Sequence, residues 1–268
     1  CETLFGLSYV FTKDATGRAT PLMILGWRFT VAFIAMTLCV LAGIMKINLK
    51  GKPKKPLILI AALNPVIYFT AETWGISKLT ASESGAFLAC IPIASLMAST
   101  AILRIRPSIR QTAGILITLI GVLATVFASG ISASFSPSGY AFLAAAVISY
   151  ALYSVGVSKA SGYTEAEMTY AMLMLGAAVF SAAAAAEALM AGKLETLLLL
   201  PLRDKAFLSA VLYQGICCSI VALFLSNMAI SRIGVNRTAS FIGLSTAVSI
   251  AAGILFLREP FTPLQGVG

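Results

Sequence analysis

Long apolar stretches separated by short polar links fill the chain from one end to the other. A helix needs about 20 apolar residues to cross the hydrocarbon core of a bilayer, which is roughly 30 Å thick. By that measure the sequence predicts nine membrane spans, the first of them incomplete, and the start of a tenth. The predicted spans are residues 1–13, 21–45, 56–77, 82–103, 110–130, 140–160, 166–190, 206–230 and 235–257, and the tenth begins at 261–268.

One stretch of the sequence occurs twice: ISKLTASESGAF at residues 76–87 returns as ISRIGVNRTASF at residues 230–241. In both copies an apolar span ends in Ile-Ser and a cation, and the next span opens with small residues and a phenylalanine. Self-similarity in a fixed order indicates a duplicated structural unit. We therefore divide the chain into a first five-helix repeat (1–130), a link (131–139) and a second repeat (140–268) that is incomplete at its C-terminal end.

Five spans per repeat is an odd number, so the second repeat enters the membrane from the opposite side to the first. The predicted fold class is an all-α polytopic membrane protein with ten transmembrane helices, arranged as two inverted five-helix repeats with a truncated tenth helix. Inverted repeats are a recurrent plan of secondary transporters, in which two similar halves move about a site near the midplane.

The composition agrees with a membrane protein, because 59% of the residues are hydrophobic and 11% are charged, against about 25% charged residues in a soluble domain. The net charge of +9 comes from cations between the apolar spans, where they set topology and meet lipid head groups. The predicted partners are thus membrane lipid and a small-molecule substrate, with no nucleic acid. The chain has no histidine and no CxxC or P-loop motif, so neither a metal site nor a cofactor is expected.

The distribution of cations between the loops predicts orientation. Loops 2-3, 4-5, 6-7 and 8-9 hold eleven Lys and Arg residues, and the other side holds seven. The richer side is expected to be cytoplasmic, which places both termini inside the cell and the protein in the inner membrane. The eleven are Lys46, Lys50, Lys52, Lys54, Lys55, Arg104, Arg106, Arg110, Lys159, Arg232 and Arg237; the seven are Lys13, Arg18, Lys78, Lys193, Arg203, Lys205 and Arg258.

Several motifs stand out along the chain: Gly6 with Lys13 in the first span, Pro21 seven residues before Arg28, the TASESGAF opening of the fourth span, and the LREP corner leading toward Gly266. With these motifs the whole chain resembles the EamA-type drug/metabolite transporters, including the aromatic and neutral amino-acid exporters among them. The resemblance implies ten spans in two repeats and a central cavity lined by spans one, three, four, six, eight and nine. It also implies transport, often export, of amino acids or related compounds.

Two carboxylates lie deep inside predicted spans. Glu2 precedes Lys13 by eleven residues, which is about 16 Å along a helix and close to the bilayer centre. Glu72 follows Asn64 and Tyr68 at four-residue intervals, so the three side chains form one stripe on a helix. Two interpretations remain open: a hydrogen-bonded seam between helices, or a site where the acids meet a substrate ammonium group or carry protons.

Aromatic and amide residues occupy other spans of the same set. Tyr9 shares the helix face of Glu2, Tyr150 and Tyr153 are three residues apart in span six, and Tyr213 and Asn227 share a face of span eight. Such groups on facing helices can bind organic cations or rings as a set, although each alone is more often a packing residue. The substrate-binding candidates are Glu2, Tyr9, Asn64, Tyr68, Glu72, Tyr150, Tyr153, Tyr213 and Asn227.

Arg28 lies a turn or two into the second span. We interpret it as structural, because such an arginine usually snorkels to the membrane interface or pairs locally, here with Asp14 or Glu83.

Prolines predict hinges in the first half. Pro65 in the third span and Pro92 in the fourth each remove a backbone hydrogen bond and bend their helix. Their counterparts in the second half, Ser219 and Thr246, are not prolines. We therefore expect the bending during transport to occur in the first half.

The leading hypothesis is a secondary active transporter that moves a small amphipathic metabolite, most simply an amino acid, by alternating access. Protons are a candidate coupling ion, and the chain is expected to act as a monomer or weak homodimer. The alternatives are an intramembrane enzyme, for which the sequence offers no metal-ligand spacing or GxSxG motif, and a pore, which would give a flux that does not saturate.

Overall fold

The computed structural model describes residues 1–105, 108–109, 111–114, 117, 120–121 and 136–258 of the chain. Within those residues the regular structure is entirely helical, as the sequence predicts. Seven membrane-length apolar segments are found there. Most of the predicted fifth span (110–130) and of the link (131–139), and all of the predicted start of the tenth span (261–268), lie outside the described residues.

The helices of the first half are α1 (Glu2–Thr16), α2 (Pro21–Leu41), α3 (Lys55–Ala61), the π-helical segment η1 (Ala62–Ile67), α4 (Tyr68–Lys78), α5 (Ala81–Leu88) and α6 (Ile91–Leu103). Those of the second half are α8 (Pro137–Lys159), α9 (Glu165–Met190), α10 (Leu194–Arg203), α11 (Lys205–Leu212), the π-helical segment η2 (Tyr213–Ala222), α12 (Leu223–Ile233), α13 (Val235–Ala239) and α14 (Ile242–Leu257).

Where they fall on described residues, the predicted span boundaries agree with the helices to within three residues, except at the end of the second span. The ninth span, predicted at 235–257, runs from Val235 to Leu257. The second was predicted to reach residue 45, but α2 ends at Leu41. Gly43 adopts a positive φ of 75°, and the Ile44 amide donates a hydrogen bond to the Cys39 carbonyl. This is a helix-terminating turn that glycine favours, and apolar length alone does not reveal it.

Capping residues fix where several helices begin. Thr80 forms a capping box with Glu83 at the start of α5, and Thr164 forms one with Glu167 at the start of α9. Each threonine side chain accepts a hydrogen bond from the first turn, and each glutamate accepts one from the threonine amide, so two otherwise unpaired N–H groups are satisfied. Asp204 caps α11, where its carboxylate accepts hydrogen bonds from the amides of Ala206 and Phe207.

Helix interruptions occur at matching places in both halves. The alignment of residues 76–87 with 230–241 sets η1 opposite residues 216–221, which lie inside η2. The fourth span is broken between Leu88 and Ile91, and the ninth is broken between Ala239 and Ile242. Interruptions therefore occur in the second half as well, although Ser219 and Thr246 stand there in place of the prolines. The expectation that bending during transport occurs in the first half stays a prediction. A π-helical turn inserts one extra residue into a helix and can form without proline. The absence of proline at Ser219 and Thr246 therefore did not predict regular helices there.

The two prolines proposed as hinges have different settings. Pro65 lies inside η1, directly after Asn64, whose backbone is extended (φ −140°, ψ 112°). Pro92 lies in the first turn of α6, after the break in the fourth span. A proline in the first turn costs no helix hydrogen bond, so Pro92 begins a helix and does not bend a continuous one.

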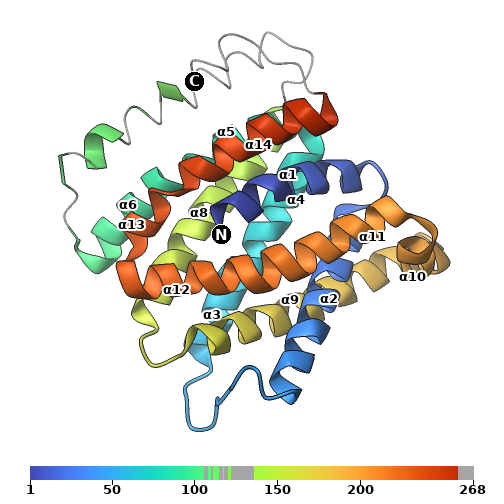
Figure 1. Ribbon diagram of the computed structural model, residues 1–268, viewed down its shortest axis with the longest axis horizontal. Coiled ribbons are helices and arrows are strands. Elements are labelled where there is room, and N and C mark those ends of the chain that lie inside the picture. Colours follow the sequence, from blue (N-terminus) through green and yellow to red (C-terminus); the bar gives the residue numbers. More distant parts are fainter. Residues whose placement is uncertain (106–107, 110, 115–116, 118–119, 122–135, 259–268) are drawn as a thin grey trace.

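Helices from the two halves pack against each other in pairs. Figure 1 shows α1 beside α14 near the top of the molecule and α2 crossing α9 near the bottom, with α4 and α8 between these layers. Glycine permits the closest contacts: a Cβ on Gly6 would lie 2.6 Å from the Ser245 carbonyl oxygen, and one on Gly85 would lie 1.9 Å from Ser249 Oγ. Figure 1 also places the N-terminus near the middle of the view.

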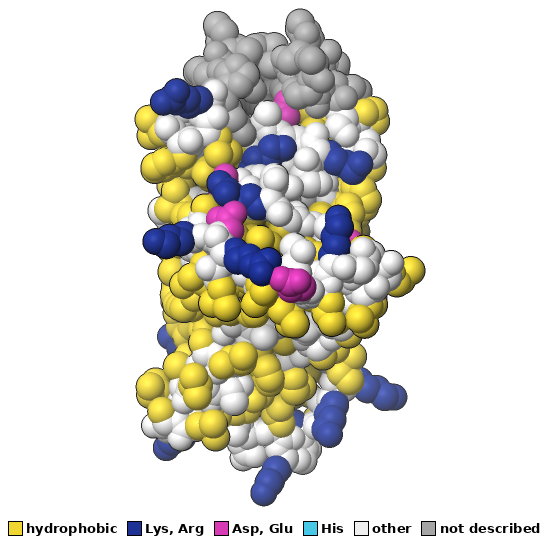
Figure 2. Space-filling view, turned by 90° about the vertical axis from the view of Figure 1, so that its right-hand side faces the viewer, with side chains coloured by type: hydrophobic (Ala, Val, Ile, Leu, Met, Phe, Trp, Pro, Cys, Tyr) yellow, Lys and Arg dark blue, Asp and Glu magenta, His cyan; other side chains and the backbone are white. Residues whose placement is uncertain are grey.

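Figure 2 shows the end of the molecule that lies on the right in Figure 1. Charged side chains of both signs gather in the upper half of this view, and hydrophobic side chains predominate below them. Exposed Leu, Ile, Phe and Met side chains also occur along the spans, among them Leu38, Met97 and Leu255. Large exposed apolar surfaces of this kind suit contact with lipid.

Candidate functional site

A cavity of about 20 Å³ lies between the two halves of the bundle. Space of this size holds about one water molecule. Residues from spans one, three, four, six, eight and nine surround it, which are the spans that the family resemblance implies. The lining residues are Glu2, Phe5 and Tyr9 of α1, Asn64 of η1, Tyr68 and Phe69 of α4, Ile91 of α6, Tyr150 of α8, Leu223 of α12, and Ile242 and Ser245 of α14.

A hydrogen-bonded acid and a pair of tyrosines form one side of the site. The Tyr68 hydroxyl donates a hydrogen bond of 2.7 Å to Glu72 Oε1, as the four-residue spacing on one helix face allows. The Tyr68 ring lies 5.6 Å from the ring of Tyr150, centroid to centroid. Glu72 is 3% exposed, so this carboxyl group lies behind Tyr68 and outside the cavity lining. The hydroxyl and the acid act as one buried polar unit.

Asn64 brings unused hydrogen-bonding capacity to the cavity. Its side chain is 1% exposed, and neither the amide oxygen nor the amide nitrogen has a partner. The neighbouring Leu63 carbonyl, next to the break in the helix, accepts a hydrogen bond of 2.7 Å from Ser149 Oγ. A buried amide without partners costs free energy, so Asn64 is a position where a ligand or water gains hydrogen bonds.

Glu2 is the carboxylate that lines the cavity directly. It is 7% exposed and shares the lining with Tyr9 of α1 and Ser245 of α14. The first and ninth spans can meet here because Gly6 lets α1 approach α14 closely. The site therefore has an acid in the lining and a second acid one hydrogen bond behind it.

Besides Glu72, three predicted site residues lie outside this cavity lining. The Tyr153 hydroxyl donates a hydrogen bond of 2.6 Å to Asn227 Oδ1, and Asn227 Nδ2 donates to Thr169 Oγ1 at 2.9 Å. These contacts join α8, α9 and α12 in a satisfied network. Tyr213 stacks on Phe11 with ring centroids 4.4 Å apart and donates to the Leu4 carbonyl. All three side chains have partners in the helix interfaces.

The position of Arg28 contradicts the interpretation drawn from the sequence. This arginine neither snorkels nor pairs with Asp14 or Glu83, because its side chain is 1% exposed and is bonded to the eighth span. Thr20 caps α2, and the helix runs on to Leu41. Arg28 lies on the buried face of this helix. Asp14 instead pairs with Arg18, and Glu83 completes the cap of α5.

The sequence interpretation also missed the apolar part of the lining. Phe5, Phe69, Ile91, Leu223 and Ile242 are ordinary core residues by type, and nothing in the sequence separates them from their neighbours. For Phe69 one indication was present, namely that it directly follows Tyr68, a predicted site residue. Ser245 had a weaker one, as a polar residue within an apolar span.

A larger hollow of about 680 Å³ lies at the surface between the α2–α3 loop and α9. Leu57, Met174 and Leu175 contribute to its apolar walls, and Lys50, Lys52 and Lys54 contribute to its lining. It holds none of the acids, tyrosines or amides described above. Its size alone does not make it the transport site, and apolar walls beside lysines suit the lipid boundary.

The bundle of apolar helices around a small polar cavity places this chain among polytopic membrane proteins. A model of the EamA-like transporter family matches residues 2–127 and 137–268, and the chain belongs to that family. A curated relative, the uncharacterized transporter YcxC of Bacillus subtilis (strain 168), is 32% identical over 258 residues, which cover 96% of this chain and 82% of YcxC. A crystal structure with 16% sequence identity matches the fold with a TM-score of 0.67, over 99% of this chain and 91% of that one.

Proposed function

We propose that this protein is a secondary transporter that moves a small organic metabolite by alternating access, with amino acids or related amphipathic compounds as substrates and export as the direction. The observation that carries the proposal is the cavity between the halves, where Glu2, Tyr9, Asn64, Tyr68 and Tyr150 meet. A carboxylate, aromatic faces and an unpartnered amide can bind an ammonium group and the polar or aromatic parts of such a molecule.

Inverted symmetry between the halves is consistent with the packing. Under the proposed division into 1–130, 131–139 and 140–268, span one corresponds to span six and span four to span nine. The pair α1 and α14 then corresponds to the pair α8 and α6, and both pairs are in contact. The interruptions in spans three and eight fall at aligned positions of the two repeats. In transporters with inverted repeats, the two halves exchange conformations, and the site then opens to the other side of the membrane.

The structure has a closed site. Small-molecule pockets usually measure about 300–1,000 Å³, far more than the 20 Å³ found here. A metabolite therefore enters only after the helices move apart. The helix breaks beside Pro65 and Pro92 are our candidates for the bending points.

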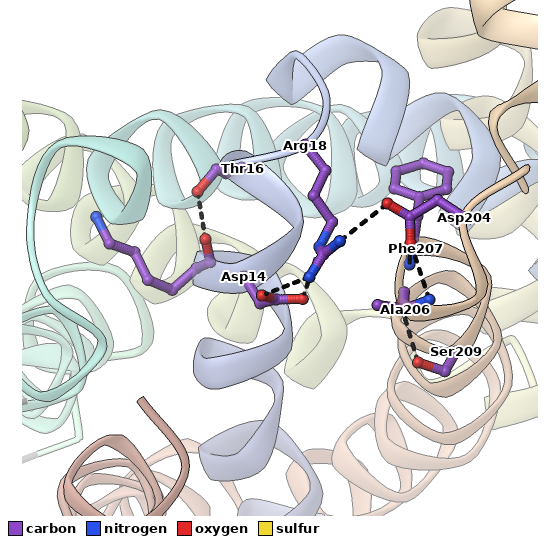
Figure 3. Close-up of polar contacts among 8 residues, drawn as sticks. Asp14, Thr16, Arg18, Asp204, Ala206, Phe207 and Ser209 are labelled. Carbon is purple, nitrogen blue, oxygen red and sulfur yellow. Dashed lines mark hydrogen bonds and ion pairs between the residues drawn. The ribbon is translucent and has the colours of Figure 1, made fainter. Parts of the chain in front are cut away.

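Ion pairs join the halves at both ends of the bundle. Arg18 of the α1–α2 turn binds Asp14 and also Asp204, which precedes α11 (Figure 3). Lys52 of the α2–α3 loop binds Glu167 of α9. Under the proposed repeat, these two contacts between the halves are equivalent. The α1–α2 turn corresponds to the α8–α9 turn, and the α2–α3 connection corresponds to the α9–α11 connection. We infer that each pair holds its end closed and that one opens at a time.

We further propose that both termini face the cytoplasm and that the protein lies in the inner membrane, from the excess of cations in loops 2-3, 4-5, 6-7 and 8-9. Protons are the proposed coupling ion, because Glu2 and Glu72 are acids inside the bundle that could carry them. A monomer suffices for the site, since one chain supplies all the lining residues described.

The test is uptake of labelled amino acids into liposomes that contain the purified protein, with and without an imposed proton gradient. Wild type is compared with Glu2→Gln and Glu72→Gln, and with Glu195→Gln as a control, because Glu195 is 73% exposed and pairs with Arg203. We expect saturable uptake that both buried variants lose and the control keeps. A response to the gradient that disappears in the same variants supports proton coupling.

Other outcomes would redirect the proposal. Saturable uptake that ignores both variants would make these acids structural. Flux that never saturates would favour the pore. An absence of flux for every amino acid would exclude this substrate class. The enzyme alternative is set aside because the family is one of transporters.

A further inference from the structure

The guanidinium group of Arg28 is buried in the middle of the bundle with part of its hydrogen-bonding capacity unused. Its Nε donates to Ser219 Oγ at 2.8 Å, and its Nη1 donates to Gln214 Oε1 at 3.4 Å. Arg28 Nη2 has no partner, and neither has Gln214 Nε2, although both side chains are 1% exposed. Two adjoining side chains of α2 and η2 therefore each present an unsatisfied N–H donor.

The charge of Arg28 is also left without an ion-pair partner. No carboxylate of the described residues forms an ion pair with it. The guanidinium carbon lies 4.0 Å from the ring centroid of Phe69 and 5.6 Å from that of Phe29. Aromatic faces offset part of the cost of burying a cation, but a buried charge is normally paired. The site thus favours a group that brings a negative charge and accepts two hydrogen bonds.

Phe69 connects this cationic position with the cavity. Its ring covers the Arg28 guanidinium, and the same side chain lines the cavity together with Glu2, Asn64 and Tyr68. Arg28 is not among the lining residues. It is nevertheless close enough to interact electrostatically with Glu72. Movement of one aromatic side chain would therefore open the cavity onto the guanidinium group.

We propose that Arg28 and Gln214 form the subsite for a carboxylate group of the substrate, which reaches them when Phe69 moves aside. A carboxylate accepts two parallel N–H donors from a guanidinium group, and it supplies the missing charge. Glu2 and Glu72 remain as partners for an ammonium group. The substrate class is then zwitterionic amino acids and not simple amines. This inference rests on the proposed transport function and specifies its substrate.

The test measures thermal stabilisation of the purified protein by three probes: phenylalanine, phenethylamine, which lacks the carboxylate, and 3-phenylpropionate, which lacks the ammonium group. The other amino acids and their decarboxylated amines are tested in the same way. In wild type we expect the amino acid that binds to do so about 10- to 100-fold more tightly than its amine, the loss typical of one charge-assisted contact.

Gln214→Glu is the decisive variant, because it places a carboxylate beside Arg28 and should satisfy the guanidinium from within. We expect it to unfold at an equal or higher temperature than wild type and to lose the preference for the amino acid over its amine. Arg203→Gln removes an exposed arginine and should keep that preference. A second variant, Phe69→Leu, removes the ring that covers Arg28 and should keep or strengthen carboxylate binding.

Equal affinity of wild type for amino acid and amine would overturn the inference, and so would a Gln214→Glu protein that keeps the full preference. If no carboxylate binds but amines do, the carboxylate subsite is refuted while a transport site with buried acids survives. If no probe of any kind binds and no flux occurs, both the inference and the amino-acid substrate class fail.

Discussion

Lys52 Nζ lies 2.6 Å from Glu167 Oε2, and this ion pair ties the loop after α2 to the beginning of α9. The carboxylate is 3% exposed and also accepts hydrogen bonds from the amides of Thr164 and Asn48. One side chain thus caps a helix of the second half and holds a loop of the first. We expect Lys52→Met to lower the free energy of unfolding by about 1 kcal/mol, the upper range for an ion pair with one exposed partner.

Glu167→Gln should cost more than Lys52→Met, because it weakens the cap as well as the ion pair. The measurement is thermal unfolding of each variant in the same detergent. Lys50→Met is the matched control, since Lys50 is an exposed lysine of the same loop. If Lys50→Met and Lys52→Met lowered stability equally, the ion pair would have no specific role.

Asp204 predicts a dependence of stability on pH. The amide of Phe207 and the guanidinium of Arg18 bind its carboxylate, and the hydrogen bond from Phe207 and then the contact with Arg18 lower the pKa of Asp204. The hydrogen bond to Asp14 and then the one to Asp204 raise the pKa of Arg18. Because the folded pKa lies below the unfolded value of about 3.9, the stabilisation is present at neutral pH and is lost as the pH falls through the folded value.

We therefore expect Asp204→Asn to lower the melting temperature at pH 7 and to differ less from wild type as the pH drops below about 4. Asp14→Asn serves as the comparison, because Asp14 binds Arg18 (Figure 3) but caps no helix. It should have the smaller effect at pH 7. A difference between Asp204→Asn and wild type that does not change with pH would contradict the assignment.

The membrane spans could be predicted from sequence because bilayer thickness fixes the length of an apolar helix. The ninth span was predicted to the residue. The helix α10 was not predicted, since its ten residues are too few to span the membrane. Helix periodicity correctly grouped Tyr68 with Glu72, whose hydrogen bond runs along one helix.

Which side chains meet between helices could not be predicted from the sequence. Asn64 and Asn227 are the same residue type in equivalent spans, yet one is unpartnered beside the cavity and the other is fully bonded. The difference depends on how each helix is rotated toward its neighbours. The depth of Arg28 along its span likewise did not reveal that it points toward Ser219 of the other half.

Gly85 should not tolerate a side chain. A Cβ at this position would lie 1.9 Å from Ser249 Oγ and 2.8 Å from Ser249 Cβ, so α5 and α14 would have to separate. We expect Gly85→Ala to destabilise the protein by about 1–3 kcal/mol, as overpacking usually does. Gly243→Ala, where no atom lies within 4 Å of the new Cβ, should be neutral or slightly stabilising. Equal effects in thermal unfolding would show that the close approach of α5 and α14 is not needed.

The two asparagines provide a final contrast between stability and transport. Asn64→Leu removes an amide that has no partner, so the protein should be as stable as wild type or more so. Asn227→Leu leaves the Tyr153 and Thr169 hydroxyls without their partner and should cost about 2–4 kcal/mol. Unfolding in detergent measures these effects.

Transport should reverse the order, once values are normalised to folded protein in the liposomes. We expect Asn64→Leu to lose most of its uptake, because it removes the free hydrogen-bonding atoms of the cavity. Folded Asn227→Leu should keep more, because Asn227 does not line the cavity. If Asn64→Leu were destabilised and still transported normally, the amide would have a partner in the working protein other than the substrate. Its role in the site would then be structural, as that of Asn227 is in the described conformation.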